Sequence, residues 1–489
     1  SIIHQPAPRF KEAHMAGIGF TLRRLAAQDN LLGIVRAYGH AAVAAAGPWL
    51  FTIIALGFIY PVYYGHTKNT DLDNFCTIIM YNFSFALILS APIYMVVTRY
   101  LADGIYRKNV THAPTVLLQS LGLLYIALLP LTVWYYGYYV QMSVGLRLAA
   151  ITNLFLVALI WILSIYMTAL KSYNSITMAF ITGMALAIVC VREIGIDSPL
   201  GGAGTLIGFN IGLAWIAFSL AGKIFAEYPY RLTRHTHLAP YFRRYWDLAV
   251  GGVCYNTGIW ADKGVMWLCA PEASVLPSRM LHYHNYDNAM FLAYLTVVPA
   301  LAVFIFSIET NFFLRFQRFS EDIRTNQPLS VIRVAHRRII ASLTDSARNF
   351  LVIQGTCSLV TILLAAKIFG LLHADYLGIG MFRLGVLGSF FQALAMFEII
   401  LLSYFDCRRA TMFIQFIFLI GNVLFTLVDV RLGFSYYGYG YFLASLLMFI
   451  VASLVLFDHV MKLPYHAFIT NNMSLKLSPR AAMRRKSGT

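Results

Sequence analysis

The sequence predicts an all-α polytopic membrane protein with about twelve transmembrane helices in two six-helix bundles, and two observations carry that prediction. Of the 489 residues, 59% are apolar and 12% are charged, whereas about a quarter of the residues of soluble proteins are charged. Apolar runs also recur along the whole chain, each about as long as the 20 residues that a membrane helix needs. The segments between these runs leave no room for a sizeable external domain.

Twelve apolar runs have the length of a transmembrane helix. They cover residues 38–61, 75–98, 115–137, 147–170, 175–194, 203–226, 247–270, 289–313, 349–372, 378–402, 410–430 and 436–460. In the sixth run, Gly204, Gly208 and Gly212 form GxxxGxxxG, a pattern that allows close packing of membrane helices. A nucleotide-binding loop is disfavoured there because no strand precedes the glycines and no Lys follows at the required position.

A polar stretch between the sixth and seventh runs divides the chain. We expect a cytoplasmic N-terminal segment at 1–37, a first six-helix bundle at 38–226, a cytoplasmic linker at 227–246, a second six-helix bundle at 247–460 and a basic cytoplasmic tail at 461–489. Transporters are often built from two such halves, with the substrate path between them near the middle of the membrane.

The net charge of +16 reflects membrane topology and not a nucleic-acid surface. If the N-terminus is cytoplasmic, most of the 37 Lys and Arg residues fall on the cytoplasmic side, as the positive-inside rule requires. An even number of spans then places both termini in the cytoplasm. No cleavable signal peptide is visible, because residues 1–14 contain two prolines and no apolar core.

One predicted cytoplasmic loop is long. Residues 314–348 combine seven arginines with spaced apolar residues, a pattern typical of amphipathic helices that lie along a membrane face. Two roles remain open for this loop, which are anchoring to anionic lipid and docking of a cytosolic partner.

Asp262 and Lys263 stand side by side inside the seventh run, in GIWADKGVMWLCAP (258–271). A charge at the centre of a bilayer costs about 2.5 to 3.5 kcal/mol, so both side chains should face protein or a water-filled cavity. Adjacent residues on a helix point about 100° apart, so we expect each to find a partner on another helix. Helical spacing places Trp260 and Trp267 on the same stripe as Lys263.

Several other charged residues could pair with them. Glu398 in the tenth run is the first candidate for Lys263 because of its depth, and Glu309, Arg36 and His40 lie near the ends of the eighth and first runs. Three interpretations remain open, namely a static salt bridge between helices, a carboxylate that couples transport to a cation, and a polar lining for a hydrophilic substrate.

Aromatic residues gather at two predicted outer ends of spans, in WYYGYY (134–139) and FSYYGYGYF (434–442). Trp and Tyr are enriched where helices cross the membrane–water interface, and this is the usual explanation of such clusters. Stacking against sugar rings is the alternative.

Catalytic and cofactor sites are not indicated. The sequence contains no G-x-S-x-G motif, no metal-ligand cluster and no pair of carboxylates placed for acid–base chemistry, so we expect neither an enzyme nor a cofactor. The six cysteines form no CxxC pair and are interpreted as small core residues.

The stretches MAGIGFTLRRL (15–25), AYGHAAVAAAGPWL (37–50), GIWADKGVMW (258–267) and ETNFFLRFQRF (309–319) resemble the PelG family, the inner-membrane component of Pel exopolysaccharide export. The likeness runs from Met15 to about Lys462, although Thr21 stands where an acidic residue is expected. The resemblance implies two six-helix bundles around a central cavity in the bacterial cytoplasmic membrane, as in the multidrug/oligosaccharidyl-lipid/polysaccharide flippase superfamily. It supplies no catalytic residues.

The same resemblance implies a substrate and partners. The substrate would be a polysaccharide rich in N-acetylgalactosamine and its de-acetylated form, and the partners would be a cytosolic glycosyltransferase, a membrane receptor for cyclic di-GMP and a membrane protein with tetratricopeptide repeats. Our hypothesis is therefore a conduit or flippase in which Asp262 and Lys263 line a hydrated cavity between the halves. The alternatives are a cation-coupled multidrug exporter and a scaffold that transports nothing.

Overall fold

The computed structural model describes residues 52–59, 69–107, 109–169, 173–196, 201–233, 238–298, 312–372 and 375–466. Within these ranges the chain is almost entirely helical, and the strands there form one short hairpin. The packing divides the chain into two units, of which the larger contains Ala46–Ala300 and Phe350–Met461. This larger unit holds most of the described helices of both halves of the protein.

The helices of the N-terminal half pack around α5 and α7. They are α3 (Asn69–Tyr106), α4 (Ala113–Thr132), the π-helix η2 (Val133–Tyr139), α5 (Val144–Ala169), α6 (Tyr173–Cys190), the π-helix η3 (Val191–Ile196) and α7 (Gly202–Glu227). A Cβ at Gly212 would overlap the carbonyl oxygen of Gly183 on α6, and a Cβ at Gly208 would lie 2.7 Å from the backbone nitrogen of Val191. The close packing predicted from the glycine pattern is thus confirmed at these two glycines.

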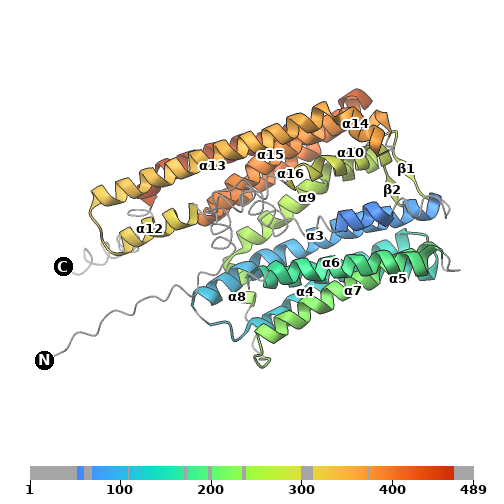
Figure 1. Cartoon of the computed structure of the whole chain (residues 1–489), viewed down its shortest axis with the longest axis horizontal. Coiled ribbons are helices and arrows are strands. Elements are labelled where there is room, and N and C mark those ends of the chain that lie inside the picture. Colours follow the sequence, from blue (N-terminus) through green and yellow to red (C-terminus); the bar gives the residue numbers. More distant parts are fainter. Residues whose placement is uncertain are drawn as a thin grey trace, which may run out of the picture. The chain divides into compact units, whose positions relative to one another are not determined.

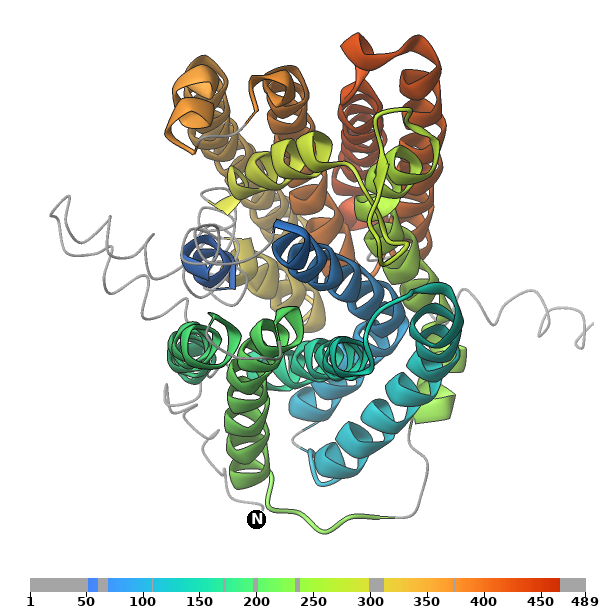
Figure 2. The ribbon, with the colours of Figure 1, turned by 90° about the vertical axis from the view of Figure 1, so that its right-hand side faces the viewer.

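The C-terminal half is built around α9, α15, α16 and α17 (Figure 1). Its elements are α8 (Leu238–Arg244), α9 (Trp246–Cys269), β1 (Ser274–Val275), β2 (Leu281–His282), α10 (His284–Leu295), α14 (Ala365–Leu371), η5 (Tyr376–Gly378), α15 (Ile379–Tyr404), α16 (Arg408–Leu432), η6 (Phe434–Tyr436) and α17 (Tyr439–Met461). The two strands pair antiparallel, with Ser274 opposite His282. Figure 2 shows the cyan-to-green helices of the N-terminal half on one side and the orange-to-red α15–α17 on the other.

Eight of the described helices are long and apolar enough to cross a membrane, or nine if one bent pair is a single span. The bent pair is α13 (Leu329–Leu363) with α14, which meet at 64° inside the expected run 349–372. A multi-pass membrane protein is therefore confirmed. The expected runs 38–61 and 289–313 lie largely outside the described residues, so the count of twelve stays a prediction. α9 is not among the eight, because polar residues such as Asp262 and Lys263 lower its hydropathy.

α3 and α9 pack antiparallel and join the two halves along one seam. Tyr81 on α3 stacks on Trp267 of α9, and Tyr94 accepts a hydrogen bond from Asn256 at 2.9 Å. One further pair, Asp103 with Tyr245 just before α9, continues the same register. Because 22 residues of helix span about 33 Å, these contacts extend over a length comparable to the hydrocarbon thickness of a bilayer.

The second unit contains Leu301–Asn349, in which α12 (Phe313–Arg324) is antiparallel to the first part of α13. The Arg315 guanidinium donates to the carbonyl oxygen of Arg338 at 3.2 Å, and Asn326, with φ of 53°, turns the chain between the helices. α13 is one continuous helix of 35 residues, so it extends from the expected loop 314–348 into the expected run 349–372. Whether these helices lie along a membrane face stays a prediction.

Candidate functional site

Asp262 and Lys263 lie in the interior of the larger unit, with 0% and 5% of their surfaces exposed. The Lys263 ammonium lies 3.4 Å from Asp262 Oδ2, so the two neighbours pair with each other. This corrects the expectation that Glu398 pairs with Lys263. The lysine side chain turns back along α9, where its Nζ also lies 3.4 Å from the carbonyl oxygen of Ile259.

Two aromatic rings complete the surroundings of the ammonium. Nζ of Lys263 lies 4.6 Å from the ring centre of Tyr294 on α10 and 5.5 Å from that of Trp260. Cations over aromatic faces gain up to about 2 kcal/mol when they are desolvated. The predicted proximity of Trp260 and Lys263 is confirmed, and the Tyr294 ring is the part that the sequence did not predict.

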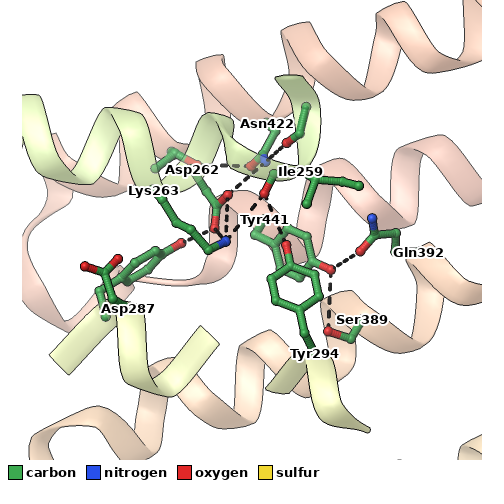
Figure 3. A network of polar contacts seen from close by, with 12 residues as sticks. Ile259, Asp262, Lys263, Asp287, Tyr294, Ser389, Gln392, Asn422 and Tyr441 are labelled. Carbon is green, nitrogen blue, oxygen red and sulfur yellow. Dashed lines mark hydrogen bonds and ion pairs between the residues drawn. The ribbon is translucent and has the colours of Figure 1, made fainter. Parts of the chain in front are cut away.

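The Asp262 carboxylate has partners on two further helices (Figure 3). Tyr286 on α10 donates to Oδ2 at 2.9 Å, and Asn422 on α16 approaches Oδ1 at 3.5 Å while donating to the carbonyl oxygen of Gly258 at 2.7 Å. The expectation of partners on other helices therefore holds for Asp262. The carboxylate ties α10 and α16 to α9.

A second set of hydrogen bonds extends this network to α15 and α17 (Figure 3). Tyr441 donates to the side-chain oxygen of Gln392, whose amide nitrogen contacts Tyr255 on α9 at 3.4 Å. Tyr294 donates to the carbonyl oxygen of Ile259 at 3.3 Å. We call Asp262, Lys263, Tyr286, Tyr294, Gln392, Asn422 and Tyr441 the charged core. All of its members belong to the C-terminal half, so in this structure the ion pair does not lie between the halves.

Of the remaining predicted ionisable residues, the structure describes Glu398 alone, which is not a member of the charged core. Glu398 accepts a hydrogen bond from Ser453 of α17 at 2.6 Å. Glu309, Arg36 and His40 are outside the described residues.

Trp267 joins the charged core to the seam between the halves. Its indole nitrogen donates to both carboxylate oxygens of Asp287 at 3.0 Å, and Asp287 is the neighbour of Tyr286 on α10. On its other side, Trp267 stacks on Tyr81 with ring centres 4.6 Å apart. Tyr81 in turn donates to the carbonyl oxygen of Leu281 in the hairpin at 2.9 Å.

The N-terminal half has a buried polar core of its own, without charges. Asn82 on α3 donates to Asn153 on α5 at 3.0 Å, and Asn153 donates to Asn210 on α7 at 2.8 Å. Tyr136 in η2 donates to Asn82 at 2.5 Å. We call Asn82, Asn153 and Asn210 the asparagine ladder. The signal was present in the sequence, because a polar residue inside an apolar run normally faces the protein interior.

The described residues hold no group of three or more His, Cys, Asp and Glu side chains that could bind a metal, and all six cysteines are free. In this structure the charged core and the asparagine ladder are networks of polar contacts between helices. Each makes one half of the protein a cooperative unit, because breaking a single contact would leave a buried polar group unsatisfied. Such halves are suited to moving as rigid bodies along the seam.

Comparison with known proteins identifies the fold and the family. The PelG family profile, described as "Putative exopolysaccharide Exporter (EPS-E)", matches residues 15–468. No curated protein matches the sequence significantly.

Solved structures give the fold. An inward-facing multidrug resistance MATE family transporter of the MOP superfamily has a TM-score of 0.61 and 12% identity, over 84% of this chain and 95% of its own. A MATE protein in complex with MaL6 has a TM-score of 0.60 and 12% identity, over 87% and 97%. A MOP superfamily transporter from Pyrococcus furiosus has a TM-score of 0.60 and 13% identity, over 92% and 97%. At such identities the likeness shows the fold alone.

Proposed function

Because the chain belongs to the PelG family of exopolysaccharide exporters, we propose that it moves an amino-sugar-rich, Pel-like polysaccharide across the bacterial cytoplasmic membrane. The family match over residues 15–468 is the observation that carries this proposal. The partners would be a cytosolic glycosyltransferase that supplies the chain, a membrane receptor for cyclic di-GMP and a membrane protein with tetratricopeptide repeats. Both termini would lie in the cytoplasm.

The chemistry of the seam supports a sugar substrate. The middle of the seam and its end beside the β1–β2 hairpin carry neutral polar groups and flat aromatic rings. These side chains include Tyr94, Asn256, Tyr81 and Trp267. Hydroxyl and acetamido groups need such hydrogen-bonding partners, and a pyranose ring can stack on an aromatic face. If the halves separate along the seam, these side chains line the opening. The path then lies beside the charged core and not through it.

A drug exporter driven by a cation gradient is less compatible with the charged core. Its coupling carboxylate would have to be able to take up a proton or a metal ion from outside. Asp262 already faces the Lys263 ammonium and accepts a hydrogen bond from Tyr286, so its charge is compensated within the protein. We therefore assign the ion pair to the integrity of the C-terminal half.

The location of the polymer in cells tests the proposal. Surface and internal polymer are measured in cells that lack this gene, with the synthase genes intact, and after complementation with the wild-type chain. Polymer that accumulates inside the deletion strain and returns to the surface on complementation supports transport. Normal surface polymer in the deletion strain would contradict it, and loss of all synthesis would favour a scaffold.

A further inference from the structure

A row of five aromatic rings leads from the surface of the N-terminal half into the seam. The members of this aromatic row, from the surface inward, are Trp134, Tyr139, Tyr135, Tyr81 and Trp267. Successive ring planes are 16° to 21° apart and successive ring centres are 4.6 to 5.9 Å apart, so each ring lies nearly parallel to the next. The exposed fraction falls from 60% at Trp134 and 39% at Tyr139 to 4% at Tyr135. The row is therefore open at one end and buried in the seam at the other.

The π-helix η2 brings the outer rings into line. Trp134 and Tyr139 are five residues apart, and on an α-helix they would point about 140° apart. In a π-helix the backbone hydrogen bonds join residues five apart, and the amide of Val140 accordingly donates to the carbonyl oxygen of Tyr135 at 2.9 Å. Residues five apart then lie on one face. Such helices are rare and occur frequently at functional sites.

Contacts on both sides fix the inner part of the row. Phe85 on α3 packs edge-on against Tyr81 and against Tyr135, with interplanar angles of 76° and 81°. Just after η2, the amide of Gln141 donates to the carbonyl oxygen of Ser278 in the hairpin at 3.0 Å. A belt of aromatic residues at the membrane interface accounts for exposed rings, but not for rings aligned from the surface down to the seam.

The chemistry of the row indicates the kind of ligand. The Tyr135 hydroxyl is buried and has no hydrogen-bond partner among the described residues, which is unfavourable unless a ligand supplies one. From Ala113 to Leu146 the chain contains no charged residue. A hydrocarbon chain offers the hydroxyl no partner, and an organic cation finds no carboxylate in this segment. A pyranose ring has both an apolar face for the aromatic rings and hydroxyl groups for Tyr135.

We propose that the aromatic row is a carbohydrate-binding track at the hairpin end of the seam. Resting on the function proposed above, its ligand is the exported polysaccharide. Sugar rings stack on the exposed Trp134 and Tyr139 while the seam is closed. Opening of the seam separates Tyr81 from Trp267 and gives a sugar hydroxyl access to Tyr135.

Binding of a tetrasaccharide of N-acetylgalactosamine to the full-length chain in detergent, measured by titration calorimetry, tests the outer end of the track. Trp134→Ala together with Tyr139→Ala removes two stacking surfaces and should weaken binding about tenfold. The matched control is Trp246→Ala with Tyr138→Ala, which removes one Trp and one Tyr that are 49% and 79% exposed and lie outside the row. This control should bind within about twofold of the wild type.

Tyr135→Phe tests the inner end and separates ligand binding from folding. The change keeps the ring and removes a hydroxyl that has no partner in the described residues, so resistance to unfolding should be unchanged or higher. Surface polymer, measured in cells at equal protein abundance, should nevertheless fall about threefold, because a sugar hydroxyl loses its partner. Tyr138→Phe, on the same π-helix, should change neither quantity.

Two results would overturn the track while leaving export intact. One is equal binding of the tetrasaccharide by the two double variants, and the other is a wild-type chain that exports polymer in cells but binds no tetrasaccharide. A loss of stability in Tyr135→Phe that matches its loss of export would contradict the role of the hydroxyl. Conversely, row-dependent binding by a chain whose deletion leaves surface polymer normal would keep the carbohydrate site and contradict export.

Discussion

The indole ring of Trp267 on α9 lies flat against the phenol ring of Tyr81 on α3, with ring centres 4.6 Å apart and planes 16° apart. This stack connects the two halves of the protein at the hairpin end of the seam. The Trp267 indole nitrogen donates a hydrogen bond to Asp287 in the same half. The Tyr81 hydroxyl donates one to the carbonyl oxygen of Leu281 in the hairpin of the other half. Opening of the seam at this end must therefore separate these two rings.

Tyr81 provides a graded test of the stack. Tyr81→Phe removes the hydrogen bond to Leu281 and keeps the ring, so we expect a loss of about 0.5 to 1.5 kcal/mol in the free energy of unfolding. Tyr81→Ala removes the ring as well and should cost about 3 to 5 kcal/mol. Thermal or denaturant unfolding in detergent measures both, and Tyr138→Ala, whose side chain is 79% exposed, is the control. Equal losses for Tyr81→Ala and Tyr138→Ala would show that the stack carries no stability.

The ion pair of the charged core makes a double-mutant prediction. Lys263→Met leaves the fully buried Asp262 carboxylate without its cation, which should cost about 3 to 5 kcal/mol. Adding Asp262→Asn removes the uncompensated charge, so the double variant should be more stable than Lys263→Met alone. The free energies of unfolding of the wild type, Lys263→Met, Asp262→Asn and the double variant, all measured in detergent, complete the double-mutant cycle. If the two losses simply add, Asp262 and Lys263 do not act as a pair.

The asparagine ladder predicts a similar sensitivity in the N-terminal half. Asn153→Leu removes the middle residue and leaves the side chains of Asn82 and Asn210 each without one partner, at about 1 to 3 kcal/mol for each unsatisfied group. Asn288, which is exposed on α10, gives the control Asn288→Ala, expected to change stability by less than about 0.5 kcal/mol. A comparable effect of the two variants on unfolding would contradict a structural role for the ladder.

The hairpin should loosen at low pH. Burial lowers the pKa of the His282 imidazole, the nearby His284 lowers it further, and Asp73 acts against both. A lowered pKa means that the folded hairpin disfavours the proton, so its stability is complete above pH of about 6.5 and falls as the pH drops below that value. We therefore expect a thiol reagent to label Ser278→Cys faster at pH 5.5 than at pH 7.5, once each labelling rate is divided by the fraction of the thiol that is ionised at that pH. His282→Gln should abolish the acceleration; if it persists, another group is responsible.

The sequence predicted the multi-pass membrane class and the family, and most of the expected runs coincide with described helices. Apolar runs and the motif GIWADKGVMW can be recognised from the sequence because they do not depend on how the helices pack. The count of twelve spans stays a prediction. It also identified Asp262 and Lys263 as buried. It failed on the partner of Lys263, since depth along a span does not reveal that a long side chain turns back along its own helix. Tyr286 and Asn422 were missed for a related reason. Which faces of α10 and α16 meet α9 is decided by tertiary packing and not by periodicity.

Reversible cross-linking of the hairpin to α3 tests most directly whether polymer passes between the halves. Ser278 donates to Asn74 at 2.8 Å, so Asn74→Cys and Ser278→Cys, in a chain whose six native cysteines are replaced, can be joined by a short cross-linker that a reductant cleaves. Surface polymer is then measured in cells before cross-linking, after it and after reduction, with the two single-cysteine variants as controls. The account predicts that only the double variant stops export and that reduction restores it. Undiminished export with the hairpin fully cross-linked would contradict passage through this seam.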